Sequence, residues 1–257
     1  MTQVWSRDSV PVMRRASAFL PGIFAFLLLV GCSATHTVTL NADGSGTVTI
    51  HLEVTRLLHD YIAGLAEASG ESQDPTGAIF DLTTVRKGFE AQPGITVQSV
   101  ASPNPNSLDI QIAFASLSRL FEDQPGLKSA NAVSLMESNG LKTLKIHLDR
   151  TNYRQIAAFF PMLESPTLQS LGPQVDQKTT DGDYLEMVRF SLGDDGPAQV
   201  KKSVITIVIR PEGEIVSQFG GTVEAGTVVF RIPLLRLLVL ATPLDYSISF
   251  KPGGTQP

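Results

Sequence analysis

The sequence predicts an α+β fold in which antiparallel β-hairpins form a curved sheet or an open barrel, with helices packed on one face. Three observations support this prediction. Alternating apolar and polar residues flank short turn sequences, which is typical of hairpins. Between the hairpins, apolar residues recur at helical spacing. Most of residues 204–250 alternates again, so the chain is rich in strands at both ends.

The N-terminal half begins with the clearest hairpin signal. Apolar residues alternate with polar ones over 37–40 and 47–54, and the turn between these segments reads Asn-Ala-Asp-Gly-Ser-Gly. The period then changes to that of a helix over 55–68. A helix over 78–91, strands at 95–97 and 108–114, and a short helix near 117–121 complete this half.

The C-terminal half also begins with a hairpin, whose strands flank Asn139-Gly140. Asn152 is predicted to cap the next helix, and Thr180 or Asp181 to cap a later one. Strands follow at 204–209, 228–232 and 244–250. We expect an N-terminal α+β lobe over 36–125 and a C-terminal α+β lobe over 126–257, or one continuous domain.

Residues 1–31 have the three parts of a secretory signal peptide. Arg14 and Arg15 precede an apolar run over 16–30, and Gly31 closes it. The run is shorter than the roughly 20 residues that span a bilayer. We therefore expect export and removal of this segment rather than a membrane span.

The end of this segment, Leu29-Val30-Gly31-Cys32, resembles the lipobox of bacterial lipoproteins. The resemblance implies that signal peptidase recognises Leu29, Val30 and Gly31, and that lipid is attached to Cys32 and holds the protein to a membrane. The alternative is an ordinary signal peptide with a chance cysteine. Cys32 is the only cysteine in the chain, which favours the lipobox.

Residues 32–35 are then the lipid anchor and a short tether. Such a tether reaches only about 12 Å, so the folded body should lie close to the headgroups. The expected location is the cell envelope. Ser33 is not the aspartate associated with inner-membrane retention, which favours the outer membrane in a cell with two membranes. In a cell with one membrane, we expect the outer face of the plasma membrane.

Charge and motif content exclude several classes of function. The chain has a formal net charge of −5, and its densest basic pair is Lys201-Lys202, so nucleic acid is not an expected partner. The four histidines are scattered and lack zinc-ligand spacing, so we expect no metal site. We also expect no catalytic residues and no cofactor, because the turn at 43–46 matches neither a nucleophile elbow nor a phosphate loop.

The apolar segment over 232–244 has two interpretations. It is too short to span a membrane, so one interpretation is a buried helix or loop that completes the core. The other is an apolar flap that closes a cavity or touches the bilayer, with Arg236 at the level of the headgroups. In that case, the residues in contact with ligand or membrane are Leu234, Leu235, Arg236, Leu237 and Leu238.

Motifs near this segment resemble those of the LppM-type bacterial lipoproteins. They are the run 211–216, the pair Gly220-Gly221, Gly226 and the strand 228–230 that ends in Phe230. The first hairpin, close after Cys32, is also similar to the start of that family. The resemblance implies an α+β body with a lipid-binding type of cavity and no enzymatic activity.

Together these features predict a membrane-anchored, non-catalytic lipoprotein of the cell envelope that binds an apolar ligand such as a lipid. The alternative is a structural or assembly lipoprotein that docks onto an envelope protein partner. Both predictions share the anchor at Cys32 and differ in what the folded body binds.

Overall fold

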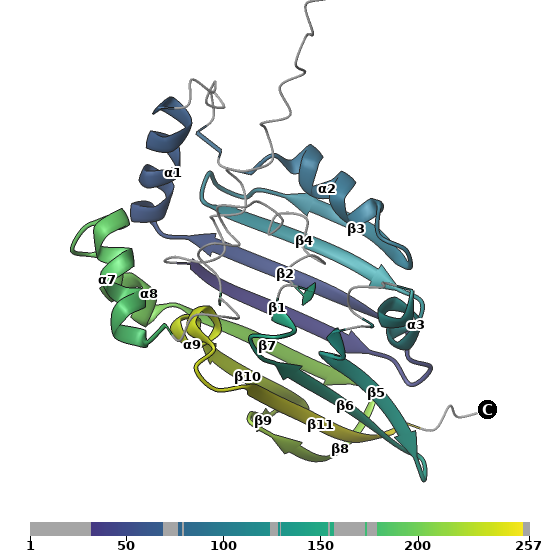
Figure 1. The fold of residues 1–257 in the computed structure, drawn as a ribbon. Helices are drawn as coiled ribbons and strands as arrows, with labels where there is room; N and C mark the ends of the chain where they lie inside the picture. Colours follow the sequence, from purple (N-terminus) through teal and green to yellow (C-terminus); the bar gives the residue numbers. More distant parts are fainter. Residues whose placement is uncertain are drawn as a thin grey trace, which may run out of the picture.

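The computed structural model describes residues 32–68, 77–78, 80–123, 128, 130–153, 155–156, 173 and 179–253. Eleven strands in two open sheets and six helices make up this described part, which confirms the α+β prediction (Figure 1). The expected signal peptide, including Leu29, Val30 and Gly31, lies outside the described residues.

The larger sheet has seven strands and contains the first hairpin at its centre. Strands β1 (Cys32–Leu40) and β2 (Gly46–Val54) are antiparallel around a turn in which Gly44 has a φ of 90°, a value that favours glycine. In spatial order the strands are β3 (Ile95–Ala101), β4 (Ser107–Phe114), β2 (Gly46–Val54), β1 (Cys32–Leu40), β7 (Val204–Pro211), β10 (Thr227–Pro233) and β9 (Thr222–Glu224).

The smaller sheet has four strands and contains the second predicted hairpin. Asn139 and Gly140 have φ values of 53° and 71°, as a type I′ turn requires, so this prediction is confirmed. In spatial order the strands are β5 (Val133–Ser138), β6 (Leu141–Leu148), β11 (Leu244–Pro252) and β8 (Gly213–Phe219).

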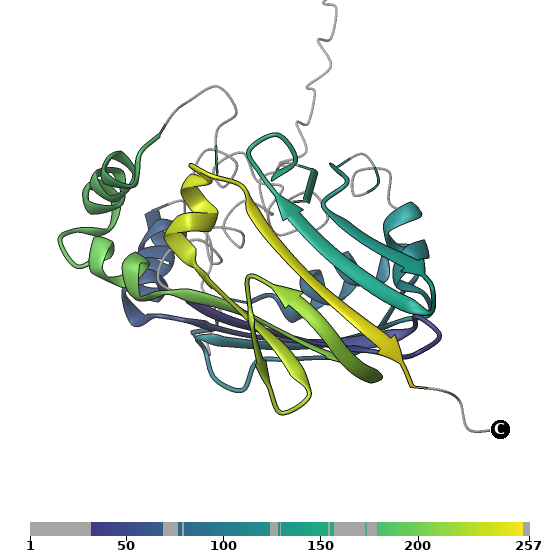
Figure 2. The same ribbon diagram turned by 90° about the horizontal axis from the view of Figure 1, so that it is seen from below.

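The helices and the smaller sheet lie on the same side of the larger sheet (Figure 2). The described helices are α1 (Arg56–Ala68), α2 (Leu82–Glu90), α3 (Leu117–Glu122), α7 (Asp181–Leu192), α8 (Gly196–Lys202) and α9 (Leu234–Val239). We call the covered side of the larger sheet its inner face and the opposite side its outer face. None of the helices in the described part is long and apolar enough to cross a bilayer.

The larger sheet joins the two halves of the chain. β1 pairs in parallel with β7, from Ala34 opposite Ile205 to Leu40 opposite Pro211. The expected lobes over 36–125 and 126–257 therefore share one sheet.

The first strand starts earlier than the sequence indicates. β1 begins at Cys32, which lies opposite Val54 in the β1–β2 register. The segment 32–35, expected to be an anchor and a tether, is therefore part of the sheet. Backbone pairing with β2 along the whole segment, and with β7 from Ala34 onward, places these residues in the sheet, which a local pattern of residues does not reveal.

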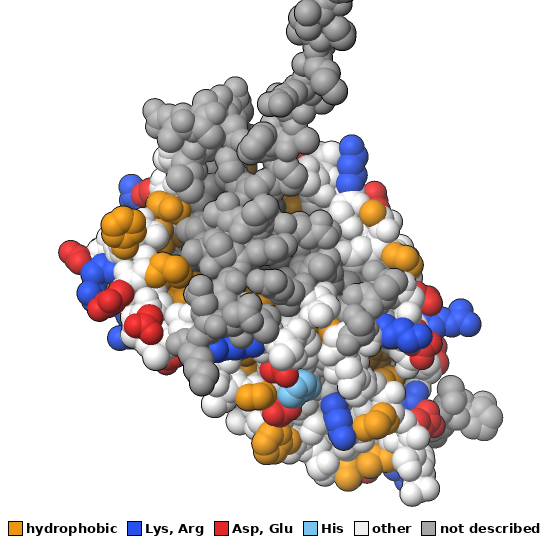
Figure 3. Space-filling view, viewed as in Figure 1, with side chains coloured by type: hydrophobic (Ala, Val, Ile, Leu, Met, Phe, Trp, Pro, Cys, Tyr) orange, Lys and Arg blue, Asp and Glu red, His pale blue; other side chains and the backbone are white. Residues whose placement is uncertain are grey.

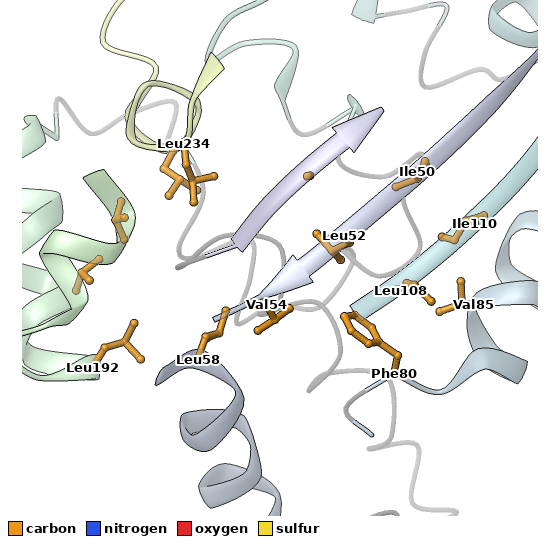
Figure 4. Close-up of a cluster of buried hydrophobic side chains, with 14 of the residues drawn as sticks. Ile50, Leu52, Val54, Leu58, Phe80, Val85, Leu108, Ile110, Leu192 and Leu234 are labelled. Carbon is orange, nitrogen blue, oxygen red and sulfur yellow. The ribbon is translucent and has the colours of Figure 1, made fainter. Parts of the chain in front are cut away.

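Two hydrophobic clusters form the core. The first lies between the larger sheet and the helices, and includes Leu52, Leu58, Val85 and Leu234 (Figure 4). The second lies between the two sheets, where Phe230 and Phe250 are fully buried. Burial of this apolar surface is the main stabilising contribution to folding.

Gly220-Gly221 lies where the chain passes from the smaller sheet to the larger one. A Cβ on Gly220 would lie 2.6 Å from the Tyr246 ring, and one on Gly221 would lie 2.6 Å from the Phe230 ring. These two rings pack together with their centroids 5.0 Å apart. Glycines at this point therefore allow the backbone to approach the aromatic pair closely.

Helix capping is confirmed at one predicted position and wrong at another. Thr180 and Asp183 form a capping box at the start of α7. Asn152 does not cap its helix: the Asp149 carboxylate accepts hydrogen bonds from the backbone N–H groups of Thr151 and Asn152 instead. The Asn152 side chain is buried, and its amide donates to the carbonyl oxygens of Ala130 and His147. These contacts orient the side chain toward the core.

Candidate ligand site and anchor end

The middle of the inner face is less buried than its ends. On β1, Ala34 and Leu40 are buried at the two ends, whereas His36 and Val38 between them are half-buried. On the neighbouring β7, Ile205 and Ile207 are half-buried as well. Protein interiors are normally close-packed, so these partly exposed positions mark the candidate ligand site.

Further apolar side chains pack next to these positions and come from several elements. Val48, Ile205 and Leu237 pack against both hydrophobic clusters, so they lie at the junction between the clusters. The smaller sheet contributes further half-buried apolar side chains next to the second cluster: Val133, Leu135, Ile146, Leu148 and Ile215. We define the inner site as His36 together with the half-buried apolar residues named here: Val38, Val48, Ile205, Ile207, Leu237 and the five residues of the smaller sheet.

His36 is the titratable side chain of the inner site. It lies opposite Ile50 on β2 and Ile207 on β7, and its imidazole has no hydrogen-bond partner among the residues that the structure describes. Desolvation lowers the pKa of His36 to about 4, because burial disfavours the charged imidazolium. The ring is therefore neutral at pH 7 and offers one N–H donor and one nitrogen acceptor.

Two buried tyrosines add hydroxyl groups to the same side of the larger sheet. Tyr184 belongs to the first cluster and Tyr153 to the second. Burial raises the pKa of Tyr153 to about 12 and raises that of Tyr184 further. The Tyr184 hydroxyl has no hydrogen-bond partner within the described part of the chain, an arrangement that costs free energy in a dry core.

The segment 232–244 divides between the core and the surface. Leu234 and Leu238 are 0% and 1% exposed and belong to the first cluster. Leu235 and Leu237 are half-buried, and Arg236 is exposed. One turn of helix α9 thus has a buried side and a side that faces outward.

Two of the other histidines, His51 and His147, contact carboxylates on strand surfaces. The Nδ1 atom of His51 lies 2.6 Å from the Asp109 carboxylate across β2 and β4. The Nδ1 atom of His147 lies 2.7 Å from Asp245, and this contact raises the pKa of His147. Within the described ranges, no group of three or more histidine, cysteine, aspartate or glutamate side chains is close enough to hold a metal ion.

A shallow polar pocket lies at the far end of β1, next to the first turn. The Glu212 carboxylate accepts a hydrogen bond from the Ala42 backbone N–H at 2.8 Å, and the Lys142 ammonium donates to the Ala42 carbonyl oxygen at 2.6 Å. These contacts tie the turn to both sheets. The charged lining does not suit an apolar ligand.

Sequence reasoning did not select His36 for the inner site. The signal was present, because His36 alternates in phase with Val38 and Leu40 and so shares their face of the strand. Its importance depends on which neighbours cover that face. Only the tertiary structure provides this information.

At the N-terminal end of β1, the parallel β1–β7 register begins with Ala34 opposite Ile205. These residues come two positions after Cys32 and Ser203, respectively. Ser203 is the C-cap of α8 and directly follows Lys201 and Lys202. The start of the first strand and the end of α8 therefore lie side by side (Figure 1).

Comparisons with known proteins give no family assignment. No model of a protein family matches the chain, and no curated protein matches it. Among solved structures, the folded domain of the Mycobacterium tuberculosis LppM protein is similar over 88% of this chain and 93% of that domain, with a TM-score of 0.40 and 10% identity. Yeast LTA4 hydrolase in complex with bestatin is similar over 97% of this chain and 34% of that enzyme, with a TM-score of 0.28 and 13% identity.

Proposed function

We propose that this protein is a membrane-anchored, non-catalytic lipoprotein of the cell envelope that binds an apolar ligand such as a lipid at the inner site. The observation that carries the proposal is the row of half-buried apolar side chains in the middle of the inner face. Ligand sites are typically concave and apolar, with a small number of polar groups that fix orientation. His36 supplies such a polar group.

The chemistry of the inner site favours an uncharged polar group on the ligand. His36 is neutral at pH 7 and can exchange hydrogen bonds with a hydroxyl or an ester. The inner-site residues named above include no lysine or arginine to pair with a buried anion. A neutral acyl-glycerol type of lipid therefore fits better than a fatty acid.

The ligand is tested by native mass spectrometry of the chain from Ser33 onward, purified without detergent. We expect co-purified lipid, or uptake of added monoacylglycerol. β7 offers a matched pair of variants, because Ile207 faces the inner site whereas Val208 lies on the outer face. Ile207→Asn should reduce lipid occupancy strongly, and Val208→Asn should leave it unchanged. A wild-type protein that stays empty with every lipid would refute the proposal.

The membrane anchor is tested separately in intact cells. The lipobox-like sequence that ends at Cys32 supports the anchor, and the expected position is the outer membrane or the outer face of a single membrane. Cys32→Ser should abolish palmitate labelling and leave unprocessed or soluble protein. Labelling that persists in this variant would contradict the anchor.

A second candidate function is docking onto an envelope protein partner. Strand β8 is an edge of the smaller sheet, and its Val216 and Phe219 side chains are 57% and 64% exposed. Hydrophobic side chains also show on the surface of this part of the molecule (Figure 3). Exposed apolar edge strands pair readily with another chain. Crosslinking in cells that captured one protein partner in stoichiometric amounts would favour docking over ligand binding.

A further inference from the structure

Helices α7 and α8 lie at the end of the molecule where β1 begins (Figure 1). The β1–β7 register begins with Ala34 opposite Ile205, two residues after Cys32 and Ser203, and the exposed Lys201 and Lys202 come directly before Ser203. The helices also pack against each other, and α7 contacts α1. These helices therefore lie at the same end of the fold as the first residue of β1.

Helix α7 has apolar side chains on two sides. Tyr184, Val188 and Leu192 point into the core. On another side, Phe190 is 94% exposed and Met187, one turn earlier, is 36% exposed. Figure 3 shows hydrophobic side chains on the surface over α7. Core packing does not account for a nearly fully exposed phenylalanine on a well-capped helix.

We propose that the α7–α8 end is a membrane-docking surface, in which Phe190 and Met187 enter the bilayer interface and Lys201 and Lys202 contact lipid phosphates. The occupant is the bilayer that holds the acyl chains on Cys32, so the inference rests on the proposed anchor. The β1 strand begins at Cys32 itself, and this leaves no spacer between the lipid and the fold. Amphipathic helices with aromatic and basic residues bind at such interfaces.

Charge sets the expected character of this contact. Glu186, Asp194 and Asp195 are also exposed on α7 and on the turn before α8, so basic residues do not dominate this end of the protein. Long-range attraction to anionic lipid is therefore small. We therefore expect short-range contributions of similar size from the insertion of Phe190 and from the two lysines at contact distance.

The test uses the chain from Ser33 onward, which keeps every described residue except Cys32 and carries no lipid. The only tryptophan of the full sequence is Trp5, so Phe190→Trp introduces a single tryptophan probe into this chain. On vesicles of phosphatidylcholine and phosphatidylglycerol, we expect its emission to shift to shorter wavelength and to be quenched by brominated acyl chains. The control is Met136→Trp on β5, an exposed position outside the α7–α8 end, where no shift is expected.

Vesicle affinity then separates the apolar contribution from the basic one. Phe190→Ser should weaken co-flotation about tenfold, because burial of one aromatic side chain is worth at least about 1.4 kcal/mol. Replacing both Lys201 and Lys202 with Gln should weaken it roughly 30-fold at low salt, at about 1 kcal/mol per lysine. Equal affinities for the wild type and Phe190→Ser would overturn the proposal.

The outcomes also distinguish this surface from the proposed function. Loss of vesicle binding in Phe190→Ser with unchanged lipid occupancy in native mass spectrometry would assign docking and ligand binding to different parts of the fold. If the tryptophan probe of Phe190→Trp stays in water while Cys32 is still labelled with palmitate, the docking surface alone is refuted. A change of oligomeric state in Phe190→Ser without vesicles would instead assign Phe190 to contact between copies of the chain, and would also overturn the proposal.

Discussion

Acidification should destabilise this protein through His36. The imidazole has its ordinary pKa of 6.5 in the unfolded chain and a pKa of about 4 in the folded protein. Between these values the unfolded state binds more protons than the folded state, so stability falls as the pH falls. The perturbation is a decrease from pH 7 to pH 5, applied to the wild type and to His36→Leu.

The magnitude follows from the two pKa values. At pH 5 the unfolded imidazole is almost fully protonated, whereas the folded one is still mostly neutral. Proton binding by the unfolded state then lowers the free energy of unfolding by about 2 kcal/mol relative to pH 7. His147 has the opposite sign, because its raised pKa gives stability that is present at low pH and lost as the pH rises through the folded value. This contribution is common to both proteins and cancels in the comparison.

The assay is urea unfolding followed by circular dichroism at each pH, with the wild type and His36→Leu measured in parallel. We expect the wild type to lose about 2 kcal/mol more than the variant between pH 7 and pH 5. The same loss in both proteins would refute the reasoning, because it would show that His36 is protonated in the folded protein or is accessible to water. Bound ligand at the inner site should raise the free energy of unfolding at both pH values.

Two further predictions concern packing. Gly46→Ala should lower the free energy of unfolding by about 1–3 kcal/mol, because the new Cβ would overlap a β1 carbonyl oxygen, whereas Gly64→Ala on an open part of α1 should raise it by about 0.5–1 kcal/mol. Leu234→Ala should cost about 2–5 kcal/mol as a fully buried position, and the half-buried Leu235→Ala should cost clearly less. Urea unfolding measures both pairs, and equal effects within either pair would contradict the packing described above.

Local patterns predicted the secondary structure well where short-range chemistry decides it. The Asn139-Gly140 turn and the Thr180 cap each depend on residues a few positions apart, and both are present in the structure. The pattern was less informative for α8, a short helix that the sequence did not indicate. Asn152 shows why a cap can fail: its amide is recruited by backbone carbonyl oxygens in the core.

The candidate site depended more on tertiary structure. Alternation along β1 placed His36 on the same face as Val38, but did not show that both side chains are only partly covered. The apolar segment around α9 was found from sequence, and the structure divided it into buried Leu234 and exposed Arg236. Burial of each side chain depends on which elements cover it, and those elements are distant in sequence.

The sequence alone determined the hairpins and most of the helices, because each depends on residues that are close along the chain. Only the tertiary structure decided that β1 pairs in parallel with β7 across the middle of the chain. That pairing joins the two halves and places Ile205 and Ile207 next to Ala34 and His36 in the inner site. Parallel strands are joined by a long connection instead of a tight turn. No short sequence motif therefore indicates which two strands will pair.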